Sequence, residues 1–135
     1  MKKLSIIFLP VFLLTACVTN NLSVPSEQTQ AQMRAIQSRA FDTADRAKVT
    51  RSVVSTMQDL GFTVRRADNT LGIVSGRSVS QDVLMTVTIR EEKGKRIIVR
   101  MNARLGANEV VEPLAYRNFF NALEKSLFLD AHMVE

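Results

Sequence analysis

The sequence predicts an α+β domain in which one antiparallel sheet carries two helices on the same face, in the order β-α-β-β-β-β-α. Two long segments, 43–60 and 114–129, repeat apolar residues at helical spacing. Between them, segments 82–90 and 96–105 alternate apolar and polar residues, which is typical of antiparallel strands covered on one side. The chain of 135 residues contains one cysteine, so an internal disulfide is excluded and an apolar core has to hold the domain together.

The first helix is expected over residues 43–60, where the apolar positions form one stripe: Val49, Val53, Met57 and Leu60. Asp42 or Thr43 is expected to cap its N-terminus, and Asp45 adds negative charge to the first turn. Gly61 then ends the helix, because glycine readily adopts the positive φ that a helix C-terminus requires.

The last helix is expected over residues 114–129, and Pro113 fits its first position. Its apolar stripe holds most of the aromatic residues of the domain: Tyr116, Phe119, Phe120, Leu123 and Leu127. This helix is therefore expected to be the main cover of the sheet.

Five strands are expected, over residues 33–41, 62–66, 71–77, 82–90 and 96–105. The first is the weakest, because its alternation allows either Ile36 or Met33 to face inward. In the last two strands, the residues expected to face the core are Val83, Met85, Val87, Ile89, Ile97, Val99, Met101, Ala103 and Leu105. Gly72 and Gly76 indicate a bulge or a close approach of two chain segments.

The N-terminal residues have the anatomy of an export signal. Lys2 and Lys3 precede an apolar run over 4–14, which has about half of the roughly 20 residues that a membrane-spanning helix needs. The run ends in Leu14-Thr15-Ala16-Cys17, which resembles the lipobox of bacterial lipoproteins. This resemblance implies cleavage before Cys17, a diacylglycerol on its sulfur and an acyl chain on its nitrogen. The alternative is a short buried helix with a core cysteine.

The same resemblance predicts where the mature chain is held. Lipoproteins of Gram-negative bacteria that stay in the inner membrane carry aspartate after the lipidated cysteine, whereas this chain has Val18. An outer-membrane anchor with the domain in the periplasm is therefore expected, with the inner membrane and the cell surface as alternatives. The predicted organisation is a leader over 1–16, a lipidated cysteine and tether over 17–32, and a single domain over 33–135.

The tether is predicted to be flexible because residues 18–32 are polar and lack an apolar period. A flexible segment of this length has an end-to-end distance of about 20 Å, which keeps the domain close to the lipid headgroups. The alternative is a short peptide that folds onto a partner.

The element order resembles the half-repeat of the TATA-box-binding fold and the small domains of outer-membrane assembly lipoproteins of the BamC type. The likeness includes a loose pattern in which Leu60-Gly61-Phe62-x-Val64 is followed by Leu71-Gly72-Ile73. It carries no catalytic motif. A ferredoxin-like βαββαβ sandwich is the alternative, and the missing last strand argues against it.

The sequence lacks a set of residues suited to catalysis or metal binding. His132 is the only histidine, and zinc sites use three or four protein ligands. An acylated Cys17 leaves no free thiol, no Gly-x-Ser-x-Gly motif is present, and Glu91 and Glu92 lie beside lysines at an expected hairpin tip. We therefore expect a protein that is not an enzyme and has no cofactor apart from the lipid on Cys17.

Arginines on the outward face of the sheet form the candidate partner-binding surface. The alternation places Arg90, Arg100 and Arg104 on that face, and Arg65 is expected to join them from a neighbouring strand. Guanidinium groups beside exposed apolar residues are typical of recognition surfaces. The alternative is an ordinary solvated sheet face that carries arginines.

These observations predict a membrane-anchored, non-enzymatic accessory or adaptor subunit of a larger envelope assembly, with an envelope protein as its partner. The alternative is a binding module for an anionic small ligand, a lipid headgroup or a cell-wall glycan. The net charge of +5 falls to +3 when Lys2 and Lys3 leave with the leader. This mild surplus, together with the export signal, argues against a nucleic-acid partner.

Overall fold

The computed structural model describes residues 27–93 and 95–130, so the leader, Cys17, the tether up to residue 26 and His132 lie outside the described residues. The elements follow one another as α1 (Glu27–Gln37), β1 (Ser38–Phe41), α2 (Arg46–Asp59), β2 (Phe62–Asp68), β3 (Ile73–Ser78), β4 (Val83–Glu92), β5 (Arg96–Leu105), β6 (Asn108–Glu109) and α3 (Pro113–Asp130).

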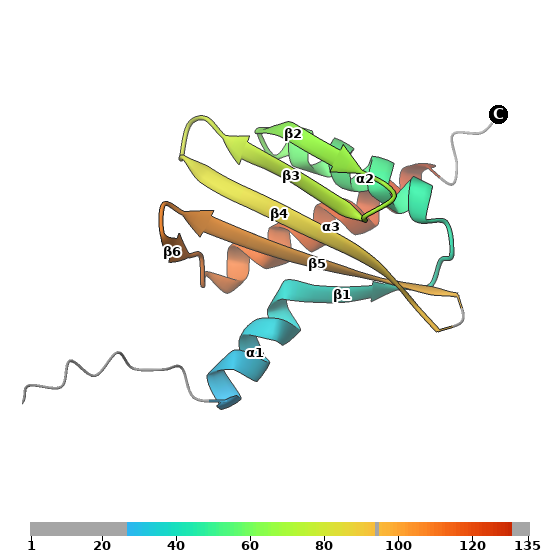
Figure 1. Ribbon diagram of the computed structural model, residues 1–135, viewed down its shortest axis with the longest axis horizontal. Coiled ribbons are helices and arrows are strands. Elements are labelled where there is room, and N and C mark those ends of the chain that lie inside the picture. Colours follow the sequence, from blue (N-terminus) through green and yellow to red (C-terminus); the bar gives the residue numbers. More distant parts are fainter. Residues whose placement is uncertain (1–26, 94, 131–135) are drawn as a thin grey trace, which may run out of the picture.

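The strands form one antiparallel sheet in the order β1-β5-β4-β3-β2, and the two-residue strand β6 pairs with β5 on the same side as β1. Figure 1 shows α2 and α3 behind this sheet, while α1 lies at the edge that β1 and β6 form. The longest pairing joins β4 and β5 over ten residues of each strand. The predicted α+β class, with one antiparallel sheet and helices packed on it, is confirmed.

The core lies between the sheet and the two helices behind it. The predicted stripes of both helices are buried, and each of the following side chains is at most 1% exposed: Val49, Val53, Met57, Tyr116, Phe119, Phe120 and Leu123. The rings of Phe119 and Phe120 meet edge to face, with centroids 5.2 Å apart. The inward alternation of β4 and β5 is confirmed for Met85 to Ile89 and for Ile97 to Ala103.

Two residues that were expected in the core are exposed. Leu60 is 39% exposed because it is the cap residue beyond the last turn of α2. Leu105 is 52% exposed and is the last residue of β5. Both residues continue the apolar period of their element, but they lie at its end, where the covering layer stops.

The start of α2 differs from the prediction, whereas its end agrees with it. The helix begins at Arg46, and its N-cap is Asp45, whose carboxylate accepts a hydrogen bond of 2.8 Å from the backbone N–H of Lys48. Neither Asp42 nor Thr43 caps the helix. The hydroxyl of Thr43 instead accepts a hydrogen bond from the backbone N–H of Asp45, the N-cap residue. At the other end, Gly61 has a φ of +83°, as predicted.

The N-terminal part of the domain was predicted wrongly. Residues 33–37 belong to α1 and not to a strand, β1 starts only at Ser38, and the last six residues of the predicted tether are helical. The segment has strong helix formers and places Met33 and Ile36 three residues apart, so that both pack against the core cluster. The short strand β6 was also missed.

The two glycines of β3 and its entry lie at close contacts, as expected. A Cβ on Gly76 would be 2.8 Å from the carbonyl oxygen of Thr63 in β2. Beside this contact, β2 has a register shift between Val64 and Arg66, which is the predicted bulge, although it lies in β2 and not in β3. The bulge decides which arginine of β2 pairs across the sheet: Arg66 lies opposite Ser75, and Arg65 has no partner in the register.

Candidate functional site

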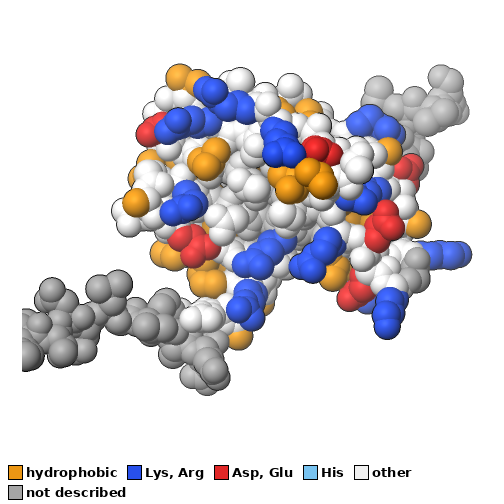
Figure 2. Space-filling view, in the orientation of Figure 1, with side chains coloured by type: hydrophobic (Ala, Val, Ile, Leu, Met, Phe, Trp, Pro, Cys, Tyr) orange, Lys and Arg blue, Asp and Glu red, His pale blue; other side chains and the backbone are white. Residues whose placement is uncertain are grey.

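The outer face of the sheet, defined as the face that points away from α2 and α3, has a polar centre. Ser75, Thr86 and Asn102 lie in register across β3, β4 and β5, and Thr88 lies opposite Arg100 in the next outward row. Figure 2 views this face and shows blue arginine and lysine side chains spread around a largely white centre. The face therefore offers hydroxyl and amide groups in the middle and guanidinium groups around them.

Three of the four predicted site residues lie on the outer face. Arg90, Arg100 and Arg104 are exposed and occupy outward positions of β4 and β5, opposite Ile98, Thr88 and Leu84. The fourth residue, Arg65, is exposed and lies in the bulge of β2, where the register gives it no partner in β3.

Two outward arginines were missed by the sequence reasoning. Arg66 lies opposite Ser75 on the outer face, because the bulge shifts the register by one residue. Arg77 lies opposite Leu84 at the end of β3. Strand alternation could have placed Arg77. Val74 faces the core, and a residue three positions away in the same strand faces the opposite side of the sheet.

Two of the arginines on β2 and β3, Arg66 and Arg77, are paired with acids. Arg66 contacts Asp68 at 3.2 Å, and Arg77 contacts Asp82 at 2.7 Å. The pKa of Asp68 lies below its ordinary value, first because the backbone N–H of Leu71 donates a hydrogen bond to its carboxylate and second because Arg66 does. The positive charges of Arg66 and Arg77 are therefore compensated locally.

The three outward arginines of β4 and β5, Arg90, Arg100 and Arg104, have no carboxylate partner among the described residues, unlike Arg96 at the start of β5, which lies 3.4 Å from Glu92. The Nη2 of Arg100 donates to the side-chain oxygen of Gln37 at 3.2 Å, and the Nη2 of Arg104 donates to the backbone oxygen of Ala107 at 3.1 Å. The side chain of Arg90 makes no hydrogen bond or ion pair within 27–93 and 95–130. We call these three residues the β4–β5 arginines; they carry three uncompensated positive charges.

Gln37, the last residue of α1, fixes one of these arginines in place. Its side chain is 1% exposed, accepts the hydrogen bond from Arg100, and donates to a carboxylate oxygen of Glu109 at 2.6 Å and to the Tyr116 hydroxyl at 3.5 Å. The same oxygen of Glu109 accepts a hydrogen bond of 2.8 Å from the amide of Asn102. The Gln37 amide therefore bridges the guanidinium group of Arg100 and the carboxylate of Glu109. Arg100 and Glu109 thus each bind a neutral side-chain amide instead of each other.

A cavity separates charges of opposite sign at the end of β5. Arg104 and Glu109 are opposite each other in the pairing of β5 with β6, yet their side chains form no ion pair. A cavity of about 250 Å³ lies at this point and is lined by Asn102, Arg104, Ala107 and Glu109. This arrangement leaves the guanidinium group of Arg104 available to a ligand on the outer face.

The chemistry that this face supports is recognition of anions. Guanidinium groups bind carboxylates and phosphates through two parallel hydrogen bonds.

Within 27–93 and 95–130, no three His, Cys, Asp or Glu side chains come together as a possible metal site. Glu91 and Glu92 are exposed and lie 3.9 Å from Arg46 and 3.4 Å from Arg96. Over the part of the chain that the structure describes, none of the helices combines the length and the apolar composition that crossing a bilayer requires.

The chain was also compared with known proteins. Neither a scan against models of protein families nor a search of curated proteins found a match.

Proposed function

We propose that the chain is a lipid-anchored envelope protein, held at the outer membrane through Cys17, and that it acts as a non-enzymatic adaptor by docking an acidic segment of a partner protein on the outer face. The single observation that carries the docking proposal is the set of β4–β5 arginines. They are exposed, they share one face, and they have no acidic partner among the described residues.

The strands that carry these residues make the surface rigid before binding. β4 and β5 are paired along their whole length, and the guanidinium group of Arg100 is further held by the buried Gln37. A preordered surface loses less conformational entropy on binding than side chains on loops do. The arginines can therefore act as a fixed set of charges.

The spacing of the charges indicates the shape of the partner. Arg100 and Arg104 are separated by four residues of one strand, or about 13 Å at 3.3 Å per residue. Arg90 lies opposite Ile98, two residues further along the strand from Arg100, and extends the row to about 20 Å. An extended segment with carboxylates at similar intervals is complementary to this row.

Charge alone does not make this interaction strong. An exposed ion pair contributes about 0.2–1 kcal/mol, so three such pairs give weak binding that falls as the salt concentration rises. Leu84, which is 43% exposed, and the half-buried Ile98 lie on the same face and can add apolar contact. We therefore expect an affinity that combines salt-dependent association with a small apolar contribution.

The test reverses the charges of the face without changing the fold. The triple variant Arg90→Glu, Arg100→Glu and Arg104→Glu, expressed in the native host and purified after crosslinking in cells, is expected to lose its envelope partner. The matched control is Arg51→Glu, Arg117→Glu and Lys125→Glu, which makes the same change in net charge at exposed positions of α2 and α3. Unchanged circular dichroism confirms folding for both variants. Equal recovery of the same partner with both would rule out the outer face.

A further inference from the structure

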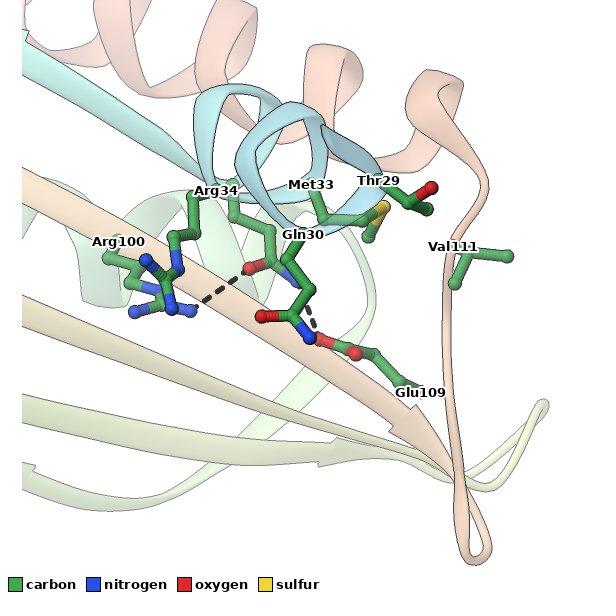
Figure 3. A pocket seen from close by; sticks show the side chains of 8 residues that line it. Thr29, Gln30, Met33, Arg34, Arg100, Glu109 and Val111 are labelled. Carbon is green, nitrogen blue, oxygen red and sulfur yellow. Dashed lines mark hydrogen bonds between the residues drawn. The ribbon is translucent and has the colours of Figure 1, made fainter. Parts of the chain in front are cut away.

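The cavity between α1 and β5 has walls of opposite charge, with the two arginines Arg34 and Arg100 and the single carboxylate of Glu109 in its lining. It measures about 210 Å³ and lies beside the edge of the sheet. Figure 3 shows Arg34 and Arg100 on one side of it and Glu109 on the other, with the side chain of Gln30 reaching toward Glu109. The remaining lining residues are Thr29, Met33, Gln37 and Val111. Ligand pockets for drug-sized molecules usually exceed about 300 Å³, so this cavity is suited to a smaller group.

The cationic wall joins two elements that are far apart in the sequence. Arg34 comes from α1 and is exposed, and Arg100 comes from β5. Neither arginine forms an ion pair with a carboxylate within 27–93 and 95–130. The buried Gln37 accepts a hydrogen bond from Arg100 and so holds its guanidinium group at the cavity. Two guanidinium groups on one small cavity are suited to the several oxygens of a phosphate group.

The acidic wall is held by neutral donors. One carboxylate oxygen of Glu109 accepts hydrogen bonds from Gln37 and from Asn102, and neither Arg34 nor Arg100 neutralises this carboxylate. The amide of Gln37 turns its oxygen toward Arg100 and its nitrogen toward Glu109, so it separates the two charges. A ligand with an anionic end and a cationic end can therefore meet both walls in one orientation.

We propose that this cavity binds a phosphoethanolamine group, with its phosphate between Arg34 and Arg100 and its primary ammonium group at Glu109. The group occurs both in a phospholipid headgroup and in soluble phosphate esters, and the charges of the cavity recognise what these sources share. Helix α1 begins ten residues after Cys17, and ten residues span at most about 35 Å. The headgroup source rests on the proposed lipid anchor, whereas binding of the soluble group does not.

The test is calorimetric titration of the purified full chain in detergent with four probes: phosphoethanolamine, glycerophosphoethanolamine, inorganic phosphate and ethanolamine. Saturable binding of phosphoethanolamine is expected, with inorganic phosphate and ethanolamine each at least about tenfold weaker, because each meets only one wall. Binding of the diester glycerophosphoethanolamine at similar affinity assigns a lipid headgroup, and binding of the monoester alone assigns a soluble compound. Absence of binding by both compounds would overturn the proposal.

Three variants connect the binding to the named residues. Arg34→Gln is expected to weaken phosphoethanolamine binding about tenfold or more, since a charge-assisted hydrogen bond is lost. Glu109→Gln is expected to abolish the preference over inorganic phosphate. Arg90→Gln, on the same face but outside the cavity, is the control and should bind normally. Unchanged affinity in Arg34→Gln, or inorganic phosphate bound as tightly as phosphoethanolamine by the unsubstituted chain, would contradict the assignment.

The same variants separate this site from the docking proposal. Arg34→Gln leaves all three β4–β5 arginines in place, so it should still capture the protein partner while losing the small ligand. The double variant Arg90→Glu, Arg104→Glu makes the reverse comparison. It should lose the protein partner and still bind phosphoethanolamine, because neither residue lines the cavity.

Discussion

Replacing Gly72 with alanine should destabilise the domain far more than the same replacement at Gly61. Both glycines have positive φ, +66° and +83°, so an alanine at either position incurs a similar backbone strain of about 1–2 kcal/mol. At Gly72, the new Cβ would also lie 2.2 Å from the carbonyl oxygen of Ile89 in β4. The Nη2 of Arg46 would lie 2.5 Å from the same Cβ. At Gly61, no atom lies within 4 Å of the new Cβ. The difference between the two variants therefore measures the close packing of Gly72 against β4 and Arg46.

The size of the effect follows from what has to move. The backbone N–H of Ile89 donates a hydrogen bond of 2.7 Å to the carbonyl oxygen of Gly72, so the contact is relieved only by moving the turn away from β4. Overpacking of this kind costs about 1–3 kcal/mol, and a weakened hydrogen bond about 0.5–1.5 kcal/mol more. We expect a loss of about 3–6 kcal/mol for Gly72→Ala and about 1–2 kcal/mol for Gly61→Ala.

Thermal and urea unfolding of the two variants measure this difference. In a domain of this size, each kcal/mol shifts the melting temperature by about 4–8 °C, so Gly72→Ala should melt at least about 8 °C below Gly61→Ala. Equal losses for the two variants would refute the reasoning, because they would leave backbone strain as the only cost at both glycines.

Three further predictions concern the core, the acid response and the anchor. Phe120→Ala should lower the free energy of unfolding by about 3–5 kcal/mol, because the ring is 1% exposed; a loss below about 1 kcal/mol in urea unfolding would contradict its burial. The folded-state pKa of Asp68 is depressed, so its contribution to stability is present above the unfolded-state pKa of about 4 and is lost as the pH falls through the folded value. Asp68→Asn should therefore flatten the decline in stability below about pH 4, and an unchanged pH profile argues against this carboxylate. Cys17→Ser should leave an unprocessed chain without lipid, as read by intact mass; an acylated, membrane-bound product would exclude the lipoprotein interpretation.

The elements with a strong period could be predicted from the sequence. The stripe from Val49 to Met57 and the one from Tyr116 to Leu123 are buried as expected, and β5 has the predicted bounds. The apolar side chains of each of these elements all face one covering layer, so the repeat of apolar residues in the sequence shows which face of the element is buried. The period does not show where that layer ends, and this is why Leu60 and Leu105 were assigned to the core although they are exposed.

The parts that could not be predicted depend on contacts between distant segments. Gln37 is a buried polar residue whose partners lie on β5, β6 and α3, and nothing in its neighbourhood in the sequence identifies them. The position of Arg66 opposite Ser75 on the outer face follows from a bulge that forms against β3. Met33 and Ile36, the two packing residues of α1, are three residues apart, which places them on one face of a helix but on opposite faces of a strand. The ambiguous alternation of the expected strand was therefore a sign of helix α1.

The most direct test of the docking proposal is site-specific photocrosslinking in cells, with the crosslinking residue in place of Ile98 on the outer face and, as control, in place of the exposed Ser55 on α2. The proposal predicts one abundant product with an envelope protein at position 98, formed through an acidic segment, absent at position 55, and lost when Arg90, Arg100 and Arg104 are changed to glutamate. The same product at both positions, or a product at position 98 that survives the charge reversal, would contradict it.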